Sequence, residues 1–317
     1  RKYLYNNSDN IIGMGGPTLA SSGITTTSFG FGNFTKQTDV GWDQAAQGIS
    51  FAASGNLTVT FTGGKNYDAG SSLSSAGAMK ASVGGITSGY DLFEDKDQFD
   101  IDFLLMGSAN YPEYEAQAIA NKIISIAELR KDVVAFVSPY RGAFLNDSAV
   151  GKGTINSSAD ITSNLIGYYA PITSSSYCVF DSGYKYMFDR FTDTFRYVPL
   201  NGDIAGTCAR NDINNFPWFS PAGTARGGIL NAVKLAYTPN QTQRDVLYSN
   251  RINPVIFSPG AGIILFGDKT GFGKASAFDR INVRRLFIFI EEAISAAAKD
   301  QLFEFNDEIT RTNFVNI

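Results

Sequence analysis

The feature that most constrains the fold is a strand–helix–strand pattern in the first half of the chain. Residues 100–106 and 133–137 are short apolar runs that predict strands. Between them, Pro112 is suited to the first position of a helix, and the acidic residues that follow suit its N-terminal end. The helix has one apolar face, formed by Ile119, Ile123 and Ile126. This βαβ unit predicts two parallel strands with a right-handed crossover, and the sheet residues are Ile101, Phe103, Leu105, Val134 and Phe136.

Helices and strands alternate along the rest of the chain. Helices are predicted at residues 159–168, 201–210, 227–235 and 239–250. A long helix should begin near Asn282, as its N-cap, and continue past Leu302 with an apolar stripe of Leu286, Ile290 and Ile294. Strands are predicted at residues 57–62 and 177–180, with hairpins at 184–189/194–198 and 255–257/262–266.

This alternation predicts an α/β fold, with a mixed and partly parallel sheet that helices flank on both faces and with β-hairpins beside it. Residues 1–50 are rich in Gly, Ser, Thr and Asn, which predicts an irregular extension that either packs on the main domain or belongs to an adjoining one. Residues 51–317 are then the α/β core domain. The chain begins Arg1-Lys2-Tyr3, without an initiator Met, and we expect it to be a fragment of a longer protein.

Composition narrows the functional classes. The chain has no His and a formal net charge of −4, which disfavours His-based catalysis, His-ligated metals and a dedicated nucleic-acid role. No apolar run is long enough to cross a membrane. Cys178 and Cys208 are expected to be free, buried thiols, although their pairing stays open. We therefore expect no cofactor, no metal, no nucleic acid and no membrane.

Short motifs of enzymes occur but do not fit their context. The run Ser182-Gly183-Tyr184-Lys185 fits the S-x-x-K pattern of penicillin-binding proteins and β-lactamases, with Lys269-Thr270-Gly271 as K-T-G and Ser8-Asp9-Asn10 as S-D-N. The order is wrong, because S-D-N comes first. The phosphate-loop-like run Val150-Gly151-Lys152-Gly153-Thr154 has Gly153 where Ser or Thr should bind magnesium. A Ser/Lys hydrolase remains the alternative of another class.

Arginines gather where the long helix is predicted to begin. Arg280, Arg284 and Arg285 lie near the positive end of the helix dipole, so they need compensation. One hypothesis is an internal pair, for instance with Asp279 or Asp268; the other is a carboxylate on a neighbouring subunit or on another partner.

An aromatic loop precedes them, with Trp218 between Phe216 and Phe219 and with Ser220 and Pro221 after it. Such a loop is either a plug of the core or an interface anchor. We take as candidate structural or inter-subunit contacts Trp218, Ser220, Pro221, Asp279, Arg280, Arg284 and Arg285.

Several blocks in this order resemble the contractile tail sheath proteins of bacteriophages. The two longest are Phe219-Ser220-Pro221-Ala222-Gly223-Thr224-Ala225-Arg226-Gly227 and Phe278-Asp279-Arg280-Ile281-Asn282-Val283-Arg284-Arg285-Leu286. Shorter ones are Tyr184-Lys185-Tyr186, Val198-Pro199-Leu200, Asp203-Ile204-Ala205-Gly206, Cys208-Ala209-Arg210, Ile252-Asn253-Pro254 and Gly267-Asp268-Lys269-Thr270. The likeness covers the chain from about residue 98 onward.

The resemblance implies a structural subunit, not an enzyme, in hexameric rings stacked as a helix around a tail tube on a baseplate. It implies assembly in the cytoplasm of a host bacterium and a place in the virion tail. The sheath of a phage-like secretion or killing device is an equally open reading. The family's N- and C-terminal arms, which add strands to neighbouring subunits, are not matched, so the isolated chain is expected to be monomeric.

Overall fold

The computed structural model describes residues 81–315, apart from residues 109, 147–154, 192 and 300–301. The described residues from Ala81 onward group into one unit by their contacts. The predicted strand at residues 57–62, the extension over residues 1–50 and the boundary between residues 50 and 51 lie outside the described residues. They stay predictions.

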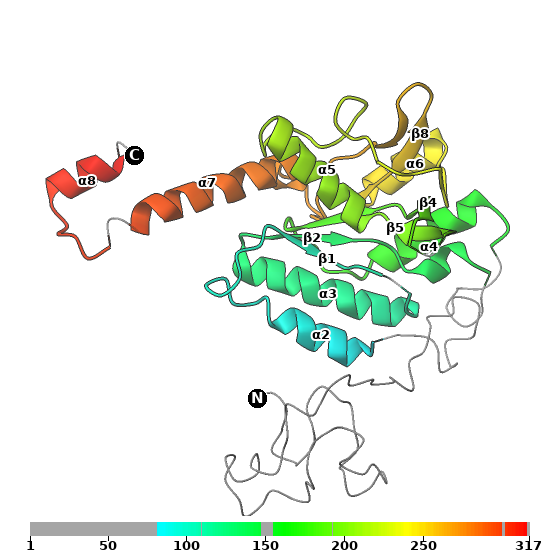
Figure 1. Ribbon diagram of the computed structural model, residues 1–317, viewed down its shortest axis with the longest axis horizontal. Helices are drawn as coiled ribbons and strands as arrows, with labels where there is room; N and C mark the ends of the chain where they lie inside the picture. The colour runs from blue at the N-terminus through cyan, green and yellow to red at the C-terminus, as the bar shows by residue number, and fades with distance from the viewer. Residues whose placement is uncertain (1–80, 109, 147–154, 192, 300–301, 316–317) are drawn as a thin grey trace, which may run out of the picture. The chain divides into compact units, whose positions relative to one another are not determined.

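A parallel sheet of four strands lies at the centre of this unit (Figure 1). Its first two strands pair in parallel, with Phe103 beside Val134 and Leu105 beside Phe136, so the predicted βαβ unit is confirmed. Ile101 precedes the first strand instead of lying in it. The strand order is β1 (Phe103–Leu105), β2 (Val134–Val137), β3 (Cys178–Asp181) and β7 (Ile252–Asn253).

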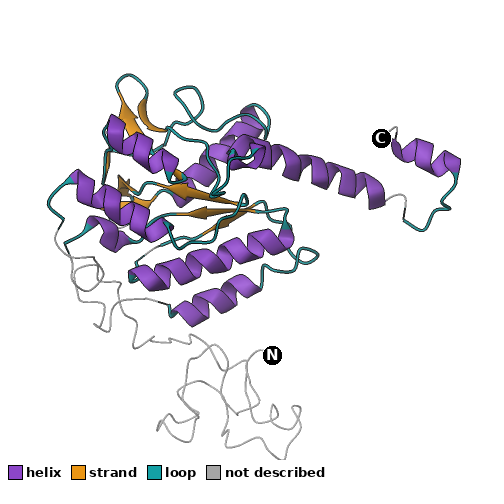
Figure 2. Cartoon of the chain, turned by 180° about the vertical axis from the view of Figure 1, so that it is seen from behind, coloured by secondary structure: helices purple, strands orange, loops and turns teal. Residues whose placement is uncertain are grey.

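Helices cover both faces of this sheet, as predicted (Figure 2). On one face lies α3 (Glu113–Arg130), whose Ile119, Ile123 and Ile126 are at most 1% exposed. Pro112 caps α3 and is not its first helical residue. α4 (Ser158–Tyr169), α2 (Val83–Asp91) and α6 (Gln241–Ser249) complete this side. The other face carries α5 (Asn201–Asn214) and α7 (Ile281–Lys299).

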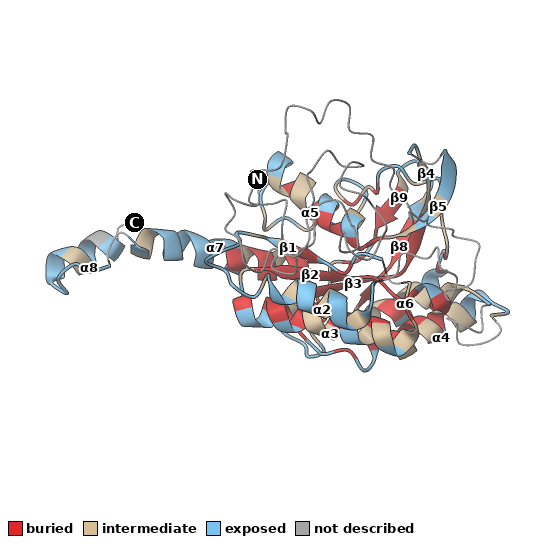
Figure 3. Cartoon of the chain, turned by 60° about the horizontal axis from the view of Figure 1, so that its bottom comes forward, coloured by how far each residue is buried: buried red, intermediate tan, exposed pale blue. Residues whose placement is uncertain are grey.

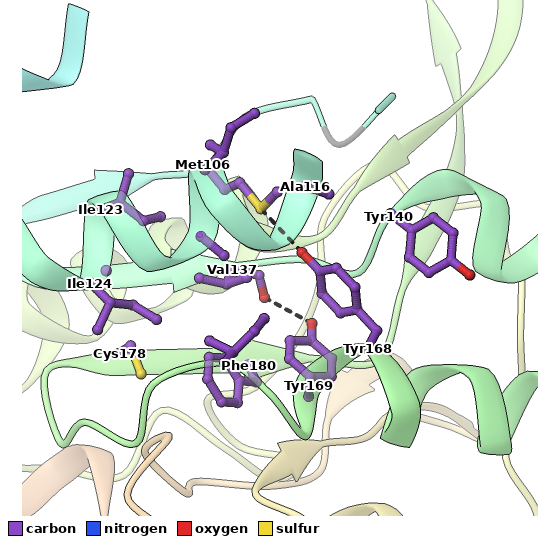
Figure 4. Close-up of a cluster of buried hydrophobic side chains, with 14 of the residues drawn as sticks. Met106, Ala116, Ile123, Ile124, Val137, Tyr140, Tyr168, Tyr169, Cys178 and Phe180 are labelled. Carbon is purple, nitrogen blue, oxygen red and sulfur yellow. Dashed lines mark hydrogen bonds between the residues drawn. The ribbon is translucent and has the colours of Figure 1, made fainter. Parts of the chain in front are cut away.

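Two apolar clusters therefore sandwich the sheet. The α3 side holds a group of buried tyrosines, in which Tyr169 stacks on Phe180 and Tyr168 donates to the sulfur of Met106 (Figure 4). On the α5 side, Phe136 and Val134 pack with Leu200 and Ile204. Alternate residues of each strand thus point to opposite clusters, as a sheet covered on both faces requires.

Two small antiparallel sheets accompany the parallel one. The predicted hairpins form as β4 (Tyr184–Asp189) with β5 (Thr194–Pro199), and as β8 (Val255–Ser258) with β9 (Gly262–Leu265). β6 (Lys234–Leu235) adds to β4 on the side away from β5. Parallel and antiparallel strands thus occupy separate sheets. The remaining helical elements are η2 (Arg141–Phe144), η3 (Ala277–Asp279) and α8 (Glu308–Val315).

The helix predicted at residues 227–235 is wrong. This segment runs beside the β8–β9 hairpin: Leu265 N–H donates to Gly227 C=O, and Ile229 N–H donates to Ile263 C=O. A Cβ at residue 227 would lie 2.7 Å from the Leu265 carbonyl oxygen, so only glycine fits. Tertiary backbone bonds replace the local helical ones here, which a propensity argument cannot see.

Helix α7 differs from its prediction at both ends. It begins at Ile281, so Asn282 is an internal residue and not the N-cap, and it ends at Lys299, before Leu302. Only its first turns contribute buried side chains, which are those of Ile281, Arg284, Arg285 and Ile288. The predicted stripe does not face the core beyond Leu286: Ile290 is 41% and Ile294 53% exposed (Figure 3).

Candidate functional site at the first turns of α7

The arginines that open α7 each have a different partner. Arg280 lies just before the helix, with Nη1 2.8 Å from Asp268 Oδ1 and Nε 3.4 Å from Asp279 Oδ1. It also donates to the hydroxyl of Tyr248. The bond to Asp268 raises the pKa of this guanidinium. Both carboxylates that the sequence offered as internal partners thus lie beside Arg280.

Arg284 is compensated without a carboxylate. Its guanidinium lies 4.2 Å from the ring centres of both Tyr177 and Phe278, and so between two aromatic rings. Nη2 and Nε donate to Ser176 Oγ at 2.7 and 3.0 Å. No acidic group of the described residues forms an ion pair with it. Burial lowers its pKa, and ring faces and hydroxyls stabilise the cation in place of a counter-ion.

Arg285 forms an ion pair with Asp212, which lies in α5. The Arg285 side chain is 7% exposed and that of Asp212 is 29% exposed. The guanidinium also donates to Pro217 C=O and lies 5.4 Å from the ring centre of Phe103. One side chain thus joins α7, α5, β1 and the aromatic loop.

The aromatic loop lies against this cluster. Trp218 stacks on Phe216, with ring centres 4.7 Å apart, and meets the ring of Phe289 in α7 edge-on at 5.7 Å. Ser220 donates to Asp268 Oδ2 at 3.2 Å, and Pro221 is buried. The loop therefore contacts α7 on one side and the Asp268 segment on the other, although Phe216 stays 54% exposed.

A pocket of about 220 Å³ opens beside Arg285. Its lining combines apolar residues with four acidic ones, and Asp212 Oδ1 is buried with no hydrogen-bond partner among the described residues. The sequence analysis did not predict this pocket. The lining residues are Asp102, Phe103, Asp132, Val134, Asp212, Pro217, Arg285, Ile288, Phe289 and Glu292.

A second unpredicted group is the carboxyl of Asp181, at the end of β3. Ser138 Oγ lies 2.5 Å from its Oδ2, and Gly183 N–H donates to Oδ1 at 2.8 Å. Burial raises the pKa of Asp181 to about 8. The hydroxyl of Ser138 also accepts the N–H of Asn201, so the carboxyl connects β2 and β3 to the start of α5.

The enzyme-like motifs have ordinary structural partners. Ser182 Oγ accepts the N–H of Val255, whereas Lys185 Nζ lies 2.7 Å from Asp203 and donates to a backbone carbonyl. Lys269 Nζ donates to the carbonyl of Tyr248. The Ser8-Asp9-Asn10 run and residues 150–154 lie outside the described part. No group of three or more metal-binding side chains occurs among the described residues, and none of the described helices is long and apolar enough to span a membrane.

Comparison with known proteins identifies the fold. The family model described as the phage tail sheath protein central domain matches residues 91–271. The chain belongs to the phage tail sheath protein family.

Named tail sheath proteins are among its relatives. That of Vibrio phage KVP40 is 42% identical over 233 residues, which is 71% of this chain and 35% of the relative. That of Enterobacteria phage T4 is 36% identical over 276 residues, or 83% of this chain and 41% of the relative. The chain therefore spans well under half the length of these tail sheath proteins.

Solved structures share the fold at low identity. The contracted helical sheath of the anti-feeding prophage aligns with a TM-score of 0.52 at 19% identity, over 73% of this chain and 55% of that one. The contracted PVC sheath of an extracellular contractile injection system aligns with a TM-score of 0.51 at 16% identity, over 68% of this chain and 52% of that one. These matches show a sheath fold for the body that carries the α7 site.

Proposed function

We propose that this chain is the folded body of a structural subunit of a contractile tail sheath, which polymerises around a tail tube and shortens to drive the tube through a bacterial envelope. The observation that carries the proposal is the 36% identity to the tail sheath protein of phage T4 over 83% of the chain. The fold shared with two contracted sheaths supports it.

The arrangement at α7 suits such a role better than catalysis. Arg280, Arg284 and Arg285 hold one helix against the body through ion pairs, aromatic rings and hydroxyls, and no nucleophile with an activating base accompanies them among the described residues. A rigid body lets contacts between subunits rearrange without unfolding each subunit. We propose that the chain is not an enzyme and needs no cofactor.

The proposed partners are other sheath subunits in hexameric rings stacked as a helix, the tail tube and the baseplate. The proposed location is the virion tail, after assembly in the host cytoplasm. In this proposal, contraction releases energy stored in subunit contacts of a kinetically trapped lattice, so no nucleotide is hydrolysed. We also propose that the isolated 317-residue chain is a monomer.

A sheath of a phage-like injection device is the second candidate, favoured by the structural likeness to the anti-feeding prophage and PVC sheaths. Electron microscopy of the natural-length protein tests both. Hollow sleeves of uniform diameter are expected from either. A protein that forms no sleeve at any concentration would contradict both candidates. The two candidates are then distinguished from each other by the contents of the particles that carry the sleeve.

A further inference from the structure

The pocket beside Arg285 holds more negative charge than the described residues neutralise. Asp212 is paired with Arg285, and Asp132 is paired with Arg130 at 2.9 Å. The other two acids of the lining, Asp102 and Glu292, form no ion pair with any of the described residues. Two exposed carboxylates thus border one pocket without a counter-charge.

Other features of the pocket also favour a cation as its occupant. Partial burial, followed by repulsion from Asp102 and Asp132, raises the pKa of Glu292. The second oxygen of Asp212 is buried and has no donor. The rings of Phe103 and Phe289 line the pocket, and aromatic faces favour a guanidinium group above other cations. The volume of about 220 Å³ leaves room for the end of a side chain.

A matching group lies on the β4–β5 hairpin. Arg190 follows β4 directly, is exposed, and lies 5.1 Å from the ring centre of Phe191, which is 85% exposed. No carboxylate among the described residues pairs with Arg190. Behind this tip, one face of the hairpin carries three further exposed rings, those of Phe188, Phe195 and Tyr197. The tip therefore presents an unpaired cation on an apolar support.

We propose that the hairpin tip of one copy docks at the first turns of α7 of a second copy, with Arg190 in the pocket between Asp102 and Glu292. Charge complementarity and the exposed aromatic rings of the tip favour this occupant: an arginine without an ion pair among the described residues meets two carboxylates that also have none. The hairpin residues do not line the pocket of their own chain. In Figures 1 and 3, β4 and β5 lie on the side of the body away from α7, so the contact must join two copies.

Such a contact is head-to-tail, because the tip and the pocket are different surfaces. A heterologous contact of this kind generates rings or helical filaments instead of closed two-fold dimers. The inference rests on the proposed sheath function and adds the contact that would join neighbouring bodies. A single arginine contact is weak, which agrees with a monomeric isolated chain, so the test must capture a transient complex.

Chemical cross-linking between two single-cysteine variants is the test. The first variant, Phe191→Cys, labels the tip and keeps Arg190; the second, Ala293→Cys, labels α7 one residue beyond Glu292. A short bismaleimide should join them into a heterodimer when they are mixed. The native Cys178 and Cys208 should not react, because both are buried and burial raises the pKa of each to about 12.

Charge reversal supplies the decisive comparison. Adding Arg190→Glu to the tip variant should lower the heterodimer yield about tenfold, and adding Glu292→Arg to the α7 variant should restore it. The matched control replaces Ala293→Cys by Leu129→Cys, at a residue of α3 that is 64% exposed. A yield no higher than in this control, or one unchanged by Arg190→Glu, would overturn the contact. Sleeves formed equally well by natural-length protein carrying Arg190→Glu would refute the contact and leave the sheath function intact.

Discussion

Removing Arg285 should destabilise the isolated chain strongly. The substitution Arg285→Ala would leave the Asp212 carboxylate without a counter-charge. The other oxygen of this carboxylate is already buried without a hydrogen-bond donor among the described residues, so neither oxygen would then have one. Breaking a buried ion pair by removing one partner costs about 3–5 kcal/mol. The Asp212 side chain is 29% exposed, so water solvates the unpaired carboxylate in part. The free energy of unfolding should therefore fall by about 3 kcal/mol, the lower end of that range.

Arg284→Ala should also destabilise, through a different interaction. It removes a cation held between the rings of Tyr177 and Phe278, each worth about 0.5–2 kcal/mol, and leaves the Ser176 hydroxyl without two donors. The expected loss is about 2–3 kcal/mol. The exposed Arg190→Ala is the matched control and should stay within about 0.5 kcal/mol of wild type.

Equilibrium unfolding in denaturant, followed by circular dichroism, measures these differences from the midpoint and slope. A double-mutant cycle of Arg285→Ala with Asp212→Asn should show a coupling of about 1–3 kcal/mol, because the residues contact each other directly. If Arg284→Ala and Arg285→Ala both unfolded at the wild-type midpoint, the internal brace would be refuted. Arg284 and Arg285 would then belong to an interface between subunits, and natural-length protein carrying either substitution should fail to polymerise.

Further predictions concern the core, the buried acid, metals and association. Ile123→Ala should lower the free energy of unfolding by about 2–5 kcal/mol, whereas Leu129→Ala on the exposed side of the same helix should lower it far less. A loss below about 1 kcal/mol for Ile123→Ala would show that the buried face of the helix was misassigned. Because burial raises the pKa of Asp181 to about 8 from 3.8, the folded state binds its proton more tightly, and stability should fall as pH rises from about 4 to about 8. Asp181→Asn should flatten that fall, and unchanged pH dependence of unfolding would contradict the assignment. Elemental analysis of dialysed protein should find no stoichiometric metal; a metal retained at one per chain would contradict the cofactor-free proposal. Sedimentation velocity of the isolated chain should give a monomer, and a stable hexamer would exclude this.

The βαβ unit could be predicted because its signals are local. The apolar face of Ile119, Ile123 and Ile126 repeats with helical spacing, and each strand is a short apolar run beside a turn. The two hairpins were predictable for the same reason, since each pairs neighbouring runs. The conformation of residues 227–235 was not predictable, because it depends on the close approach of Gly227 to Leu265, a residue far along the chain.

At the α7 site, too, local features could be predicted from the sequence and contacts with distant residues could not. The excess of cations at a helix start was visible, and it correctly indicated that compensation was needed. Its nature was not visible, because Asp212 lies 73 residues from Arg285 and the hydroxyl of Ser176 lies 108 residues from Arg284. Asp181 was missed because a carboxyl that follows a buried strand looks the same in sequence whether it faces water or the core.

Helical reconstruction of sleeves of the natural-length protein by cryo-electron microscopy tests the central claim most directly. We predict that the body formed by residues 81–315 repeats around a hollow lumen, with Arg284 and Arg285 inside each subunit and with six subunits in each ring. A natural-length protein that forms no sleeve, or a sleeve whose density cannot contain the parallel sheet and its two helical layers, would contradict it.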